Sequence, residues 1–182
     1  MSKSEDQEIL RLVQKDATKE KGFRLLVENH QERVYQLVRR MVIIHEDADD
    51  LTQNTFIKAF KYISKFEGQS SLFTWLYRIA VNESLTFLEK KKKRYFLSMD
   101  DHQEKMMNYL ERGTLLSADV IQQKLQKALL TLPEKQRLVF HLKYQEDLGY
   151  QEISEVTGTS IGALKASYHH AVKKIKVILS EE

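Results

Sequence analysis

The chain has few of the residues that interrupt helices. Its 182 residues include one proline and six glycines, and this composition argues against a fold of many short strands joined by tight turns. Apolar residues instead recur at the three-and-four spacing of amphipathic helices along most of the chain. Examples are Val34, Leu37, Val38 and Met41, and later Leu164, Tyr168, Val172 and Ile175. The sequence therefore predicts an all-α protein.

In the middle of the chain, apolar residues no longer recur at helical spacing. Residues 96–117 are polar and weakly periodic, and we expect a flexible linker there. The predicted organisation is two small helical domains, residues 1–95 and 118–182, on either side of it. Extended at ~3.3 Å per residue, a linker of about 22 residues spans about 70 Å, which is about two helical turns of DNA.

Composition narrows the class of protein. Hydrophobic residues make up 42% and charged residues 30%, as in globular rather than disordered chains. Cysteine is absent, which excludes disulfides and thiolate metal sites. The start, MSKSEDQEIL, lacks a signal-peptide pattern, and no apolar run reaches the roughly 18 residues of a membrane span. We expect a cytoplasmic protein whose net charge of +3 is compatible with nucleic acid.

The segment YQEISEVTGTSIGALKASYHHAVKKIK, residues 150–176, has the pattern of a helix-turn-helix. Gly158 separates a short amphipathic stretch from a longer one without acidic residues, and glycine accepts the positive φ of such a turn. Small residues early in the second helix would let it approach base edges, and later lysines would neutralise phosphates. The candidate DNA-binding residues are Ser160, Ala163, Lys165, Ala166, Ser167, His169, His170, Lys173 and Lys174. A solvated basic helix in a hairpin is the alternative.

A second distinctive segment, DADDLTQNTFIKAFKYISKFEGQSSLFTWLYRIAVNESLTFLEKKKKR, covers residues 47–94. Ser70 or Ser71 is suited to cap the helix that follows, and the lysine run 90–93 suits that helix's C-terminal end. Two apolar stripes lie nearly opposite each other on this helix, so it is expected to contact partners on two sides. One stripe is Leu72, Trp75, Leu76, Ile79 and Phe87, and the other is Tyr77, Val81, Leu85 and Leu88.

Together these segments resemble a bacterial sigma factor of the sigma-70 family, of the small extracytoplasmic-function type (group 4). Residues 47–94 are similar to the family's region 2. Residues 130–175, LTLPEKQRLVFHLKYQEDLGYQEISEVTGTSIGALKASYHHAVKKI, are similar to its region 4. The resemblance implies a transcription initiation factor that binds core RNA polymerase, directs it to promoters and helps to open the downstream (−10) element. Region 4 would read the upstream (−35) element.

The resemblance also implies partners. The stretch matching residues 47–60 would dock on the clamp of the polymerase's largest subunit, and region 4 would meet the flap. The candidate polymerase-binding residues are Asp47, Asp49, Asp50, Gln53, Asn54 and Phe56. By spacing, Asp50, Gln53 and Phe56 share one broad helical face, although acidic residues also suit any helix N-terminus. A membrane-anchored anti-sigma factor is a further implied partner.

In this family a base flipped from the stack is captured near the downstream element, where a stacking wall and polar groups are needed. The residues assigned to strand capture are Tyr62, Phe66, Glu67, Gly68, Gln69, Ser70, Asn82, Lys90, Lys91, Lys92, Lys93 and Arg94. Trp75 lies on the inward stripe, which favours core packing over a part in strand opening. For the lysine run, the alternative to a DNA contact is a solvated basic end of the helix.

The recognition helix departs from the family pattern. Lys165, Ser167 and His170 stand at positions often held by arginine, and lysine lacks the planar fork that binds guanine bidentately. We therefore expect weaker base readout, a different target sequence, or more reliance on DNA shape.

Three rival functions remain open, and the absence of acidic residues from the final helix argues against one of them, a bare protein-interaction module. A stand-alone helix-turn-helix regulator would bind duplex DNA without polymerase. An enzyme would use Glu46, Asp47, Asp49 and Asp50 at a divalent metal, but no nucleotide-binding or nucleophile motif accompanies them. We expect no enzymatic activity, no cofactor and no metal site.

Overall fold

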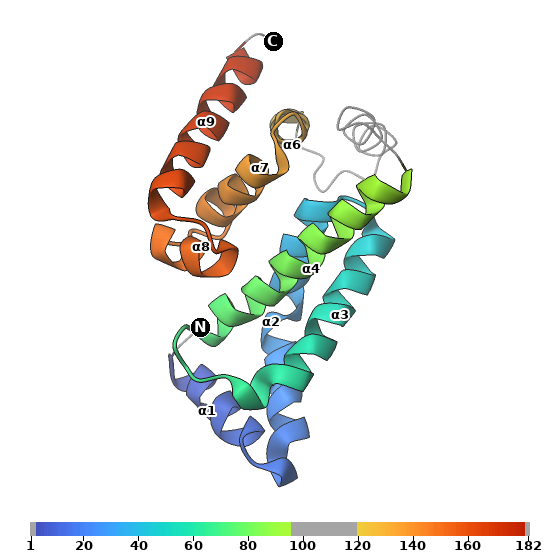
Figure 1. Ribbon diagram of the computed structural model, residues 1–182, viewed down its shortest axis with the longest axis vertical. Coiled ribbons are helices and arrows are strands. Elements are labelled where there is room, and N and C mark those ends of the chain that lie inside the picture. The colour runs from blue at the N-terminus through green and yellow to red at the C-terminus, as the bar shows by residue number, and fades with distance from the viewer. Residues whose placement is uncertain (1–2, 96–119, 181–182) are drawn as a thin grey trace. The chain divides into compact units, whose positions relative to one another are not determined.

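The computed structural model describes residues 3–95 and 120–180, and the regular elements within these ranges are all helical (Figure 1). The N-terminal part contains α1 (Lys3–Val13), η1 (Asp16–Thr18), α2 (Lys19–Val42), α3 (His45–Tyr62), η2 (Ile63–Lys65) and α4 (Leu72–Tyr95). The C-terminal part contains α6 (Val120–Leu130), α7 (Glu134–Phe140), the π-helix η3 (His141–Gln145), α8 (Tyr150–Thr157) and α9 (Ile161–Ser180). The all-α prediction is confirmed.

Two compact units make up the chain, Met1–Leu85 and Thr86–Glu182. The division falls inside α4, whereas the sequence predicted a first domain ending at residue 95. The predicted linker, residues 96–117, lies outside the described residues. The domain boundaries 1–95 and 118–182 therefore remain a prediction.

The core of the first unit joins α1, α2, η2 and the start of α4. Its fully buried residues include Ile9, Val13, Leu26, Ile63 and Leu72. The approach of α1 to α2 depends on a glycine, because a Cβ at Gly22 would lie 2.7 Å from the Cβ of Leu12. That separation is too short for two carbon atoms, so the two helices could not pack this closely with a larger residue at position 22.

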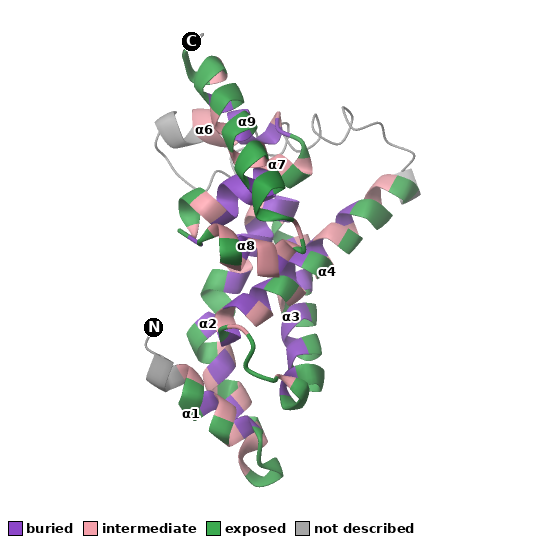
Figure 2. Cartoon of the chain, turned by 60° about the vertical axis from the view of Figure 1, so that its left-hand side comes forward, coloured by how far each residue is buried: buried purple, intermediate pink, exposed green. Residues whose placement is uncertain are grey.

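The start of α4 is fixed by Ser71. Its Oγ accepts a hydrogen bond from the backbone N–H of Thr74 at 3.0 Å, which is the geometry of an N-cap. This confirms one of the two predicted capping residues. Leu72 and Tyr77 are both buried, although they point to different sides of α4, and Figure 2 shows buried residues recurring along this helix. The predicted two-sided packing of α4 is therefore confirmed.

The second unit is built around α9, which packs on α6, α7 and α8. Its core contains Ala128, Leu129, Leu132, Phe140, Ala171 and Ile175. Most of α9 is nevertheless exposed (Figure 2), and its buried residues are Leu164, Ala171 and Ile175. Ile161, the first residue of α9, is 36% exposed.

Candidate nucleic-acid interface

An open cavity of about 180 Å³ lies between the loop that precedes α4 and the first turns of that helix. Its lining residues are Lys65, Phe66, Glu67, Gln69, Ser70, Trp75 and Arg78. Four of the residues assigned to strand capture, Phe66, Glu67, Gln69 and Ser70, are thus brought together around one space. Gly68 lies at the exposed turn of the same loop with a φ of +72°, a conformation that favours glycine.

Two aromatic rings form the apolar wall of this cavity. The ring centroids of Phe66 and Trp75 lie 5.4 Å apart, with the ring planes at 53°. Both side chains are half-buried and pack against the core of the first unit. Trp75 therefore packs against the core, as the sequence favoured, while also lining the cavity.

The rim of the cavity is polar and carries charges of both signs. Gln69 donates a hydrogen bond from Nε2 to Oε2 of Glu67 at 2.9 Å. This leaves carbonyl and carboxylate oxygens as acceptors on one side. Lys65 and Arg78 supply cations to the same lining. Sequence reasoning missed Arg78, although Ser71, Trp75 and Arg78 follow the i, i+4, i+7 spacing of one helix face.

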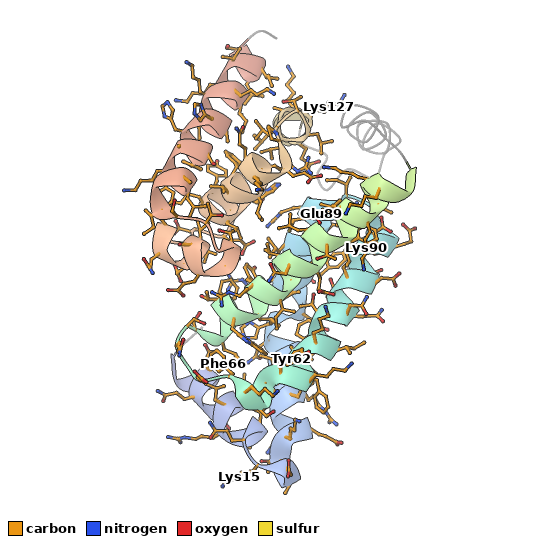
Figure 3. All side chains as sticks on the ribbon, viewed as in Figure 1. Lys15, Tyr62, Phe66, Glu89, Lys90 and Lys127 are labelled. Atoms are coloured by element: carbon orange, nitrogen blue, oxygen red, sulfur yellow. The ribbon has the colours of Figure 1, made fainter. Side chains whose placement is uncertain are left out.

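Tyr62 and Asn82 lie outside the lining of this cavity. Tyr62 is 52% exposed at the end of α3, and Figure 3 shows it and Phe66 near the same end of α3. Asn82 is exposed on α4 one turn beyond Arg78. Both remain predicted contacts that the cavity itself does not include.

Further along α4, the lysine run lies in the last turns of the helix. Lys90 and Lys93 are exposed, and Lys91 and Lys92 are partly exposed. The ammonium group of Lys91 lies 5.3 Å from the ring centroid of Phe87. Arg94 belongs to α4, but its side chain lies outside the described residues.

The acidic start of α3 presents a polar surface. Asp50, Gln53 and Asn54 are exposed, and Asp47 and Asp49 are partly exposed. Asp49 lies 3.3 Å from His45 Nε2, while His45 Nδ1 is within 2.8 Å of the Tyr35 hydroxyl.

The predicted inclusion of Phe56 in this exposed face is wrong. Phe56 is only 7% exposed, and its ring meets that of Phe23 edge to face at 6.4 Å, because α2 packs against that side of α3. Ile57 lies instead one turn after Gln53 and is 52% exposed. Its i+4 spacing from Gln53 was the signal that sequence reasoning missed.

The helix-turn-helix is formed by α8, the turn at Gly158 and α9. Gly158 has a φ of +68° and donates its N–H to the Ser154 carbonyl at 2.8 Å, as a left-handed helix cap does. Ser154 Oγ also donates to the Thr159 carbonyl at 2.7 Å. These bonds fix how α9 leaves the turn, and the predicted positive φ is confirmed.

Most of the predicted recognition residues face outward on α9. The exposed ones are Ser160, Ala163, Lys165, Ala166, His169, His170, Lys173 and Lys174, and Ser167 is partly exposed. Lys174 donates from Nζ to the Thr131 carbonyl at 2.8 Å, so that contact must be exchanged before Lys174 can reach DNA. Lys165 lies over the ring of Tyr150, with Nζ 5.9 Å from the ring centroid.

Among the described residues, no group of three or more His, Asp or Glu side chains is arranged to hold a metal ion. Within residues 3–95 and 120–180, no helix has the length and hydropathy of a membrane span.

Comparison with known proteins matches both parts of the chain. Residues 26–94 match the family described as Sigma-70 region 2, and residues 122–175 match Sigma-70, region 4. The ECF RNA polymerase sigma-E factor of Escherichia coli (strain K12) is 31% identical over 179 residues, which cover 93% of this chain and 92% of the relative. The ECF RNA polymerase sigma factor SigW of Bacillus subtilis (strain 168) is 29% identical over 163 residues, covering 85% and 87% respectively.

Solved structures share the fold. The sigma factor RpoE of Bartonella quintana, in complex with the anti-sigma factor NepR, has a TM-score of 0.69 at 22% identity and covers 88% of this chain and 98% of its own. CnrH, in complex with the cytosolic domain of CnrY, has a TM-score of 0.70 at 20% identity and covers 98% and 99%.

A helix-turn-helix unit and a second helical unit that both match sigma-factor regions define a transcription initiation factor. The chain belongs to the sigma-70 family, as an RNA polymerase sigma factor of the extracytoplasmic-function type.

Proposed function

We propose that this protein binds core RNA polymerase, brings it to promoters with two separated elements, and stabilises the opened downstream element. Residues 1–95 would dock on polymerase and hold the opened strand, residues 118–182 would read the upstream element, and residues 96–117 would connect them. The protein would act in the cytoplasm, where polymerase and promoter DNA are found.

Docking on the polymerase clamp is assigned to the exposed start of α3. Asp50 and Gln53 present a carboxylate and an amide on one face, and Asn54 adjoins them. The carboxylates would meet a basic partner, while the amides would supply directional hydrogen bonds. Asp47 and Asp49 lie beside this face and are assigned to the same contact. Exposed Ile57 would add apolar area. Region 4 would contact the polymerase flap.

Strand capture is assigned to the cavity at the start of α4, and this cavity is the observation that carries the proposal. Flipping a base costs a few kcal/mol, and stacking on an aromatic side chain offsets about 1–3 kcal/mol of that cost. The wall formed by Phe66 and Trp75 offers this stacking surface. Glu67 and Gln69 stand at the rim to bind the base edge.

Neighbouring phosphates are assigned to basic residues, because stacking alone only approximately balances the cost of flipping. Lys65 and Arg78 line the cavity, and Lys90 to Lys93 follow along α4. Arg94 extends the run in sequence. Asn82, exposed between these groups, can both donate to and accept from a base.

Upstream recognition is assigned to the outer face of α9. Ala163 and Ala166 allow close approach to the groove, and Ser167 and His170 can form hydrogen bonds with base edges. The lysines of the helix would contact phosphates.

An anti-sigma partner is proposed by analogy. One of the two solved structures described above is a complex of CnrH with the cytosolic domain of CnrY, and the other is a complex of the sigma factor RpoE with the anti-sigma factor NepR. We propose that a protein of this kind, membrane-anchored as the sequence resemblance implied, covers the polymerase-binding surface of this chain until it is released.

A promoter-opening assay on fragmented genomic DNA tests the proposal. Core polymerase and the protein are tested separately and together, with permanganate marking unpaired thymines and run-off transcripts marking start sites. Specific opening only in the combined reaction is expected. Specific duplex binding by the protein alone, with no initiation when core is added, would instead favour the stand-alone regulator.

A further inference from the structure

Three side chains link α2 to the acidic start of α3. The hydroxyl of Tyr35, on α2, lies 2.8 Å from His45 Nδ1, and His45 Nε2 lies 3.3 Å from Asp49 Oδ2. The rings of Tyr35 and His45 also meet edge to face, with their centroids 6.0 Å apart. Asp49 is assigned to polymerase docking, whereas Tyr35 and His45 are not. The contacts therefore connect a docking carboxylate to the neighbouring helix.

One tautomer of neutral His45 suits both of its neighbours. A neutral imidazole has one N–H donor and one acceptor nitrogen. With the proton on Nε2, the ring presents its N–H to the Asp49 carboxylate, and Nδ1 accepts a hydrogen bond from the Tyr35 hydroxyl. The other tautomer would place an acceptor nitrogen against the carboxylate. The Tyr35 hydroxyl thus selects the form of His45 that holds Asp49.

The turn between α2 and α3 places His45 beside Tyr35. Ile43 and Ile44 form this turn, in which the Ile44 N–H donates to the Val42 carbonyl at 2.8 Å. Ile43 has a φ of +67°, a conformation that β-branched residues rarely adopt. Such strained conformations persist where the surrounding structure imposes them, and they concentrate at functional sites. The strained turn directly precedes the helix that carries the docking surface.

The three side chains differ in how far a partner can reach them. The side chain of His45 is 56% exposed and that of Asp49 is 47% exposed, while Tyr35 is half-buried. Tyr35 is therefore the fixed end of the series, and Asp49 is the end that a partner can reach. Exposed contacts of this kind contribute little to folding stability. Their loss should affect partner binding more than unfolding.

We propose that Tyr35 and His45 are positioning residues for polymerase docking, which hold the Asp49 carboxylate in the orientation that polymerase binds. This inference rests on the proposed function of α3. Neither Tyr35 nor His45 needs to touch polymerase. Holding the carboxylate before binding reduces the conformational entropy lost when the complex forms, so Asp49 contributes more to the affinity than an unrestrained carboxylate would.

The affinity of the full-length protein for core polymerase tests the proposal, with Kd measured by fluorescence anisotropy. Tyr35→Phe removes the hydroxyl and keeps the ring, and His45→Ala removes both contacts. Each variant should raise Kd about two- to tenfold, as the loss of one hydrogen bond does. His45→Gln keeps an N–H donor that can reach Asp49, so it should recover part of the loss. Unchanged Kd in both Tyr35→Phe and His45→Ala would overturn the proposal.

A double-mutant cycle distinguishes positioning from direct contact with polymerase. Asp49→Ala should raise Kd by itself. Adding His45→Ala or Tyr35→Phe to Asp49→Ala should then change Kd little, because the carboxylate that these residues hold is already absent. If His45→Ala raises Kd by the same factor with and without Asp49, His45 acts independently of that carboxylate and the positioning assignment is wrong.

Gln36→Ala is the matched control. Gln36 donates from Nε2 to Glu32 Oε1 at 2.8 Å, so this variant removes an exposed side-chain hydrogen bond made within α2, and Kd should not change. Urea unfolding followed by Trp75 fluorescence should give the same free energy of unfolding for Tyr35→Phe, His45→Ala and the native protein. Losses of affinity that follow losses of stability, or that Gln36→Ala reproduces, would assign Tyr35 and His45 to folding alone.

The docking surface itself is tested separately by the variant that carries both Asp50→Arg and Gln53→Ala. If this variant binds polymerase normally, the proposed docking function of α3 is wrong. If it loses affinity while Tyr35→Phe and His45→Ala bind normally, docking stands and the positioning assignment alone is overturned.

Discussion

The rings of Phe66 and Trp75 lie 5.4 Å apart on one side of the cavity at the start of α4. Phe66 comes from the loop and Trp75 from the first turn of the helix. Both pack against the core that contains Ile63 and Leu72. A wall anchored in this way keeps its position when no base is bound, so little ordering entropy opposes stacking.

Trp75→Leu should weaken promoter opening by about 1–3 kcal/mol, the usual contribution of base–aromatic stacking. The measurement is the fraction of open promoter against temperature, taken with saturating protein. Phe73→Leu is the matched control, because Phe73 is a partly buried aromatic residue on α4 outside the cavity lining. Equal losses of opening in the two variants would assign Trp75 to packing alone.

Glu67→Gln should change which base is preferred at the captured position. The carboxylate accepts hydrogen bonds only, which favours bases with an exocyclic amine, whereas an amide can also donate. Open complexes selected from promoters randomised across the downstream element would reveal the preference. We expect cytosine, adenine or guanine rather than thymine with the native protein, and a weaker preference with the variant. The same preference in both would remove Glu67 from base readout.

Asp50→Arg combined with Gln53→Ala should raise the Kd for core polymerase at least about tenfold, because the reversed charge would face a basic partner. Fluorescence anisotropy of labelled protein with core polymerase gives the affinity. Glu28→Arg reverses an exposed charge on α2 and serves as the control. Unchanged affinity in the variant that carries both Asp50→Arg and Gln53→Ala would remove the docking assignment.

Phe56→Ala should instead lower the free energy of unfolding by about 3–5 kcal/mol, since its side chain is buried.

Gly158→Ala should destabilise the second unit by about 1–2 kcal/mol, because a Cβ is strained in the left-handed conformation. No atom lies within 4 Å of the position that this Cβ would occupy, so the cost comes from the backbone. Helical circular dichroism during thermal unfolding measures it. Fluorescence of Trp75, the single tryptophan of the chain, reports on the first unit and should not change. Gly158→Asn, which tolerates this conformation, should lose less stability.

His30 should make the first unit less stable in acid. Burial lowers the pKa of His30 below its ordinary 6.5, although the Asp6 carboxylate partly opposes the change. Protonation is then easier in the unfolded chain, so stability decreases as the pH falls through 6.5 toward the folded-state pKa. Urea unfolding followed by Trp75 fluorescence at several pH values measures the effect.

The variant His30→Leu isolates this contribution. Neither ring nitrogen of His30 has a hydrogen-bond partner among the described residues, so its replacement should also stabilise the unit by about 1 kcal/mol at neutral pH. His169→Gln, at an exposed position in the second unit, should leave the pH dependence unchanged. If His30→Leu also leaves the pH dependence of stability unchanged, His30 is not the source of that dependence.

The sequence by itself determined the helices and their caps. Hydrophobic residues at helical spacing mark the buried positions of α9, Ser71 supplies its side-chain oxygen to the next turn, and Gly158 accepts a conformation that other residues resist. These features depend on interactions within a few residues of each other, so they can be read directly from the order of residues along the chain.

The tertiary structure decided which of these residues meet. It buried Phe56 against Phe23, placed Arg78 beside the loop that carries Glu67, and brought Lys143 to the same ring as Lys165. The helical period gives the direction of a side chain around its own helix, but the partner depends on how the helices pack. Contacts between elements therefore follow from packing of the whole unit, and no local pattern specifies them.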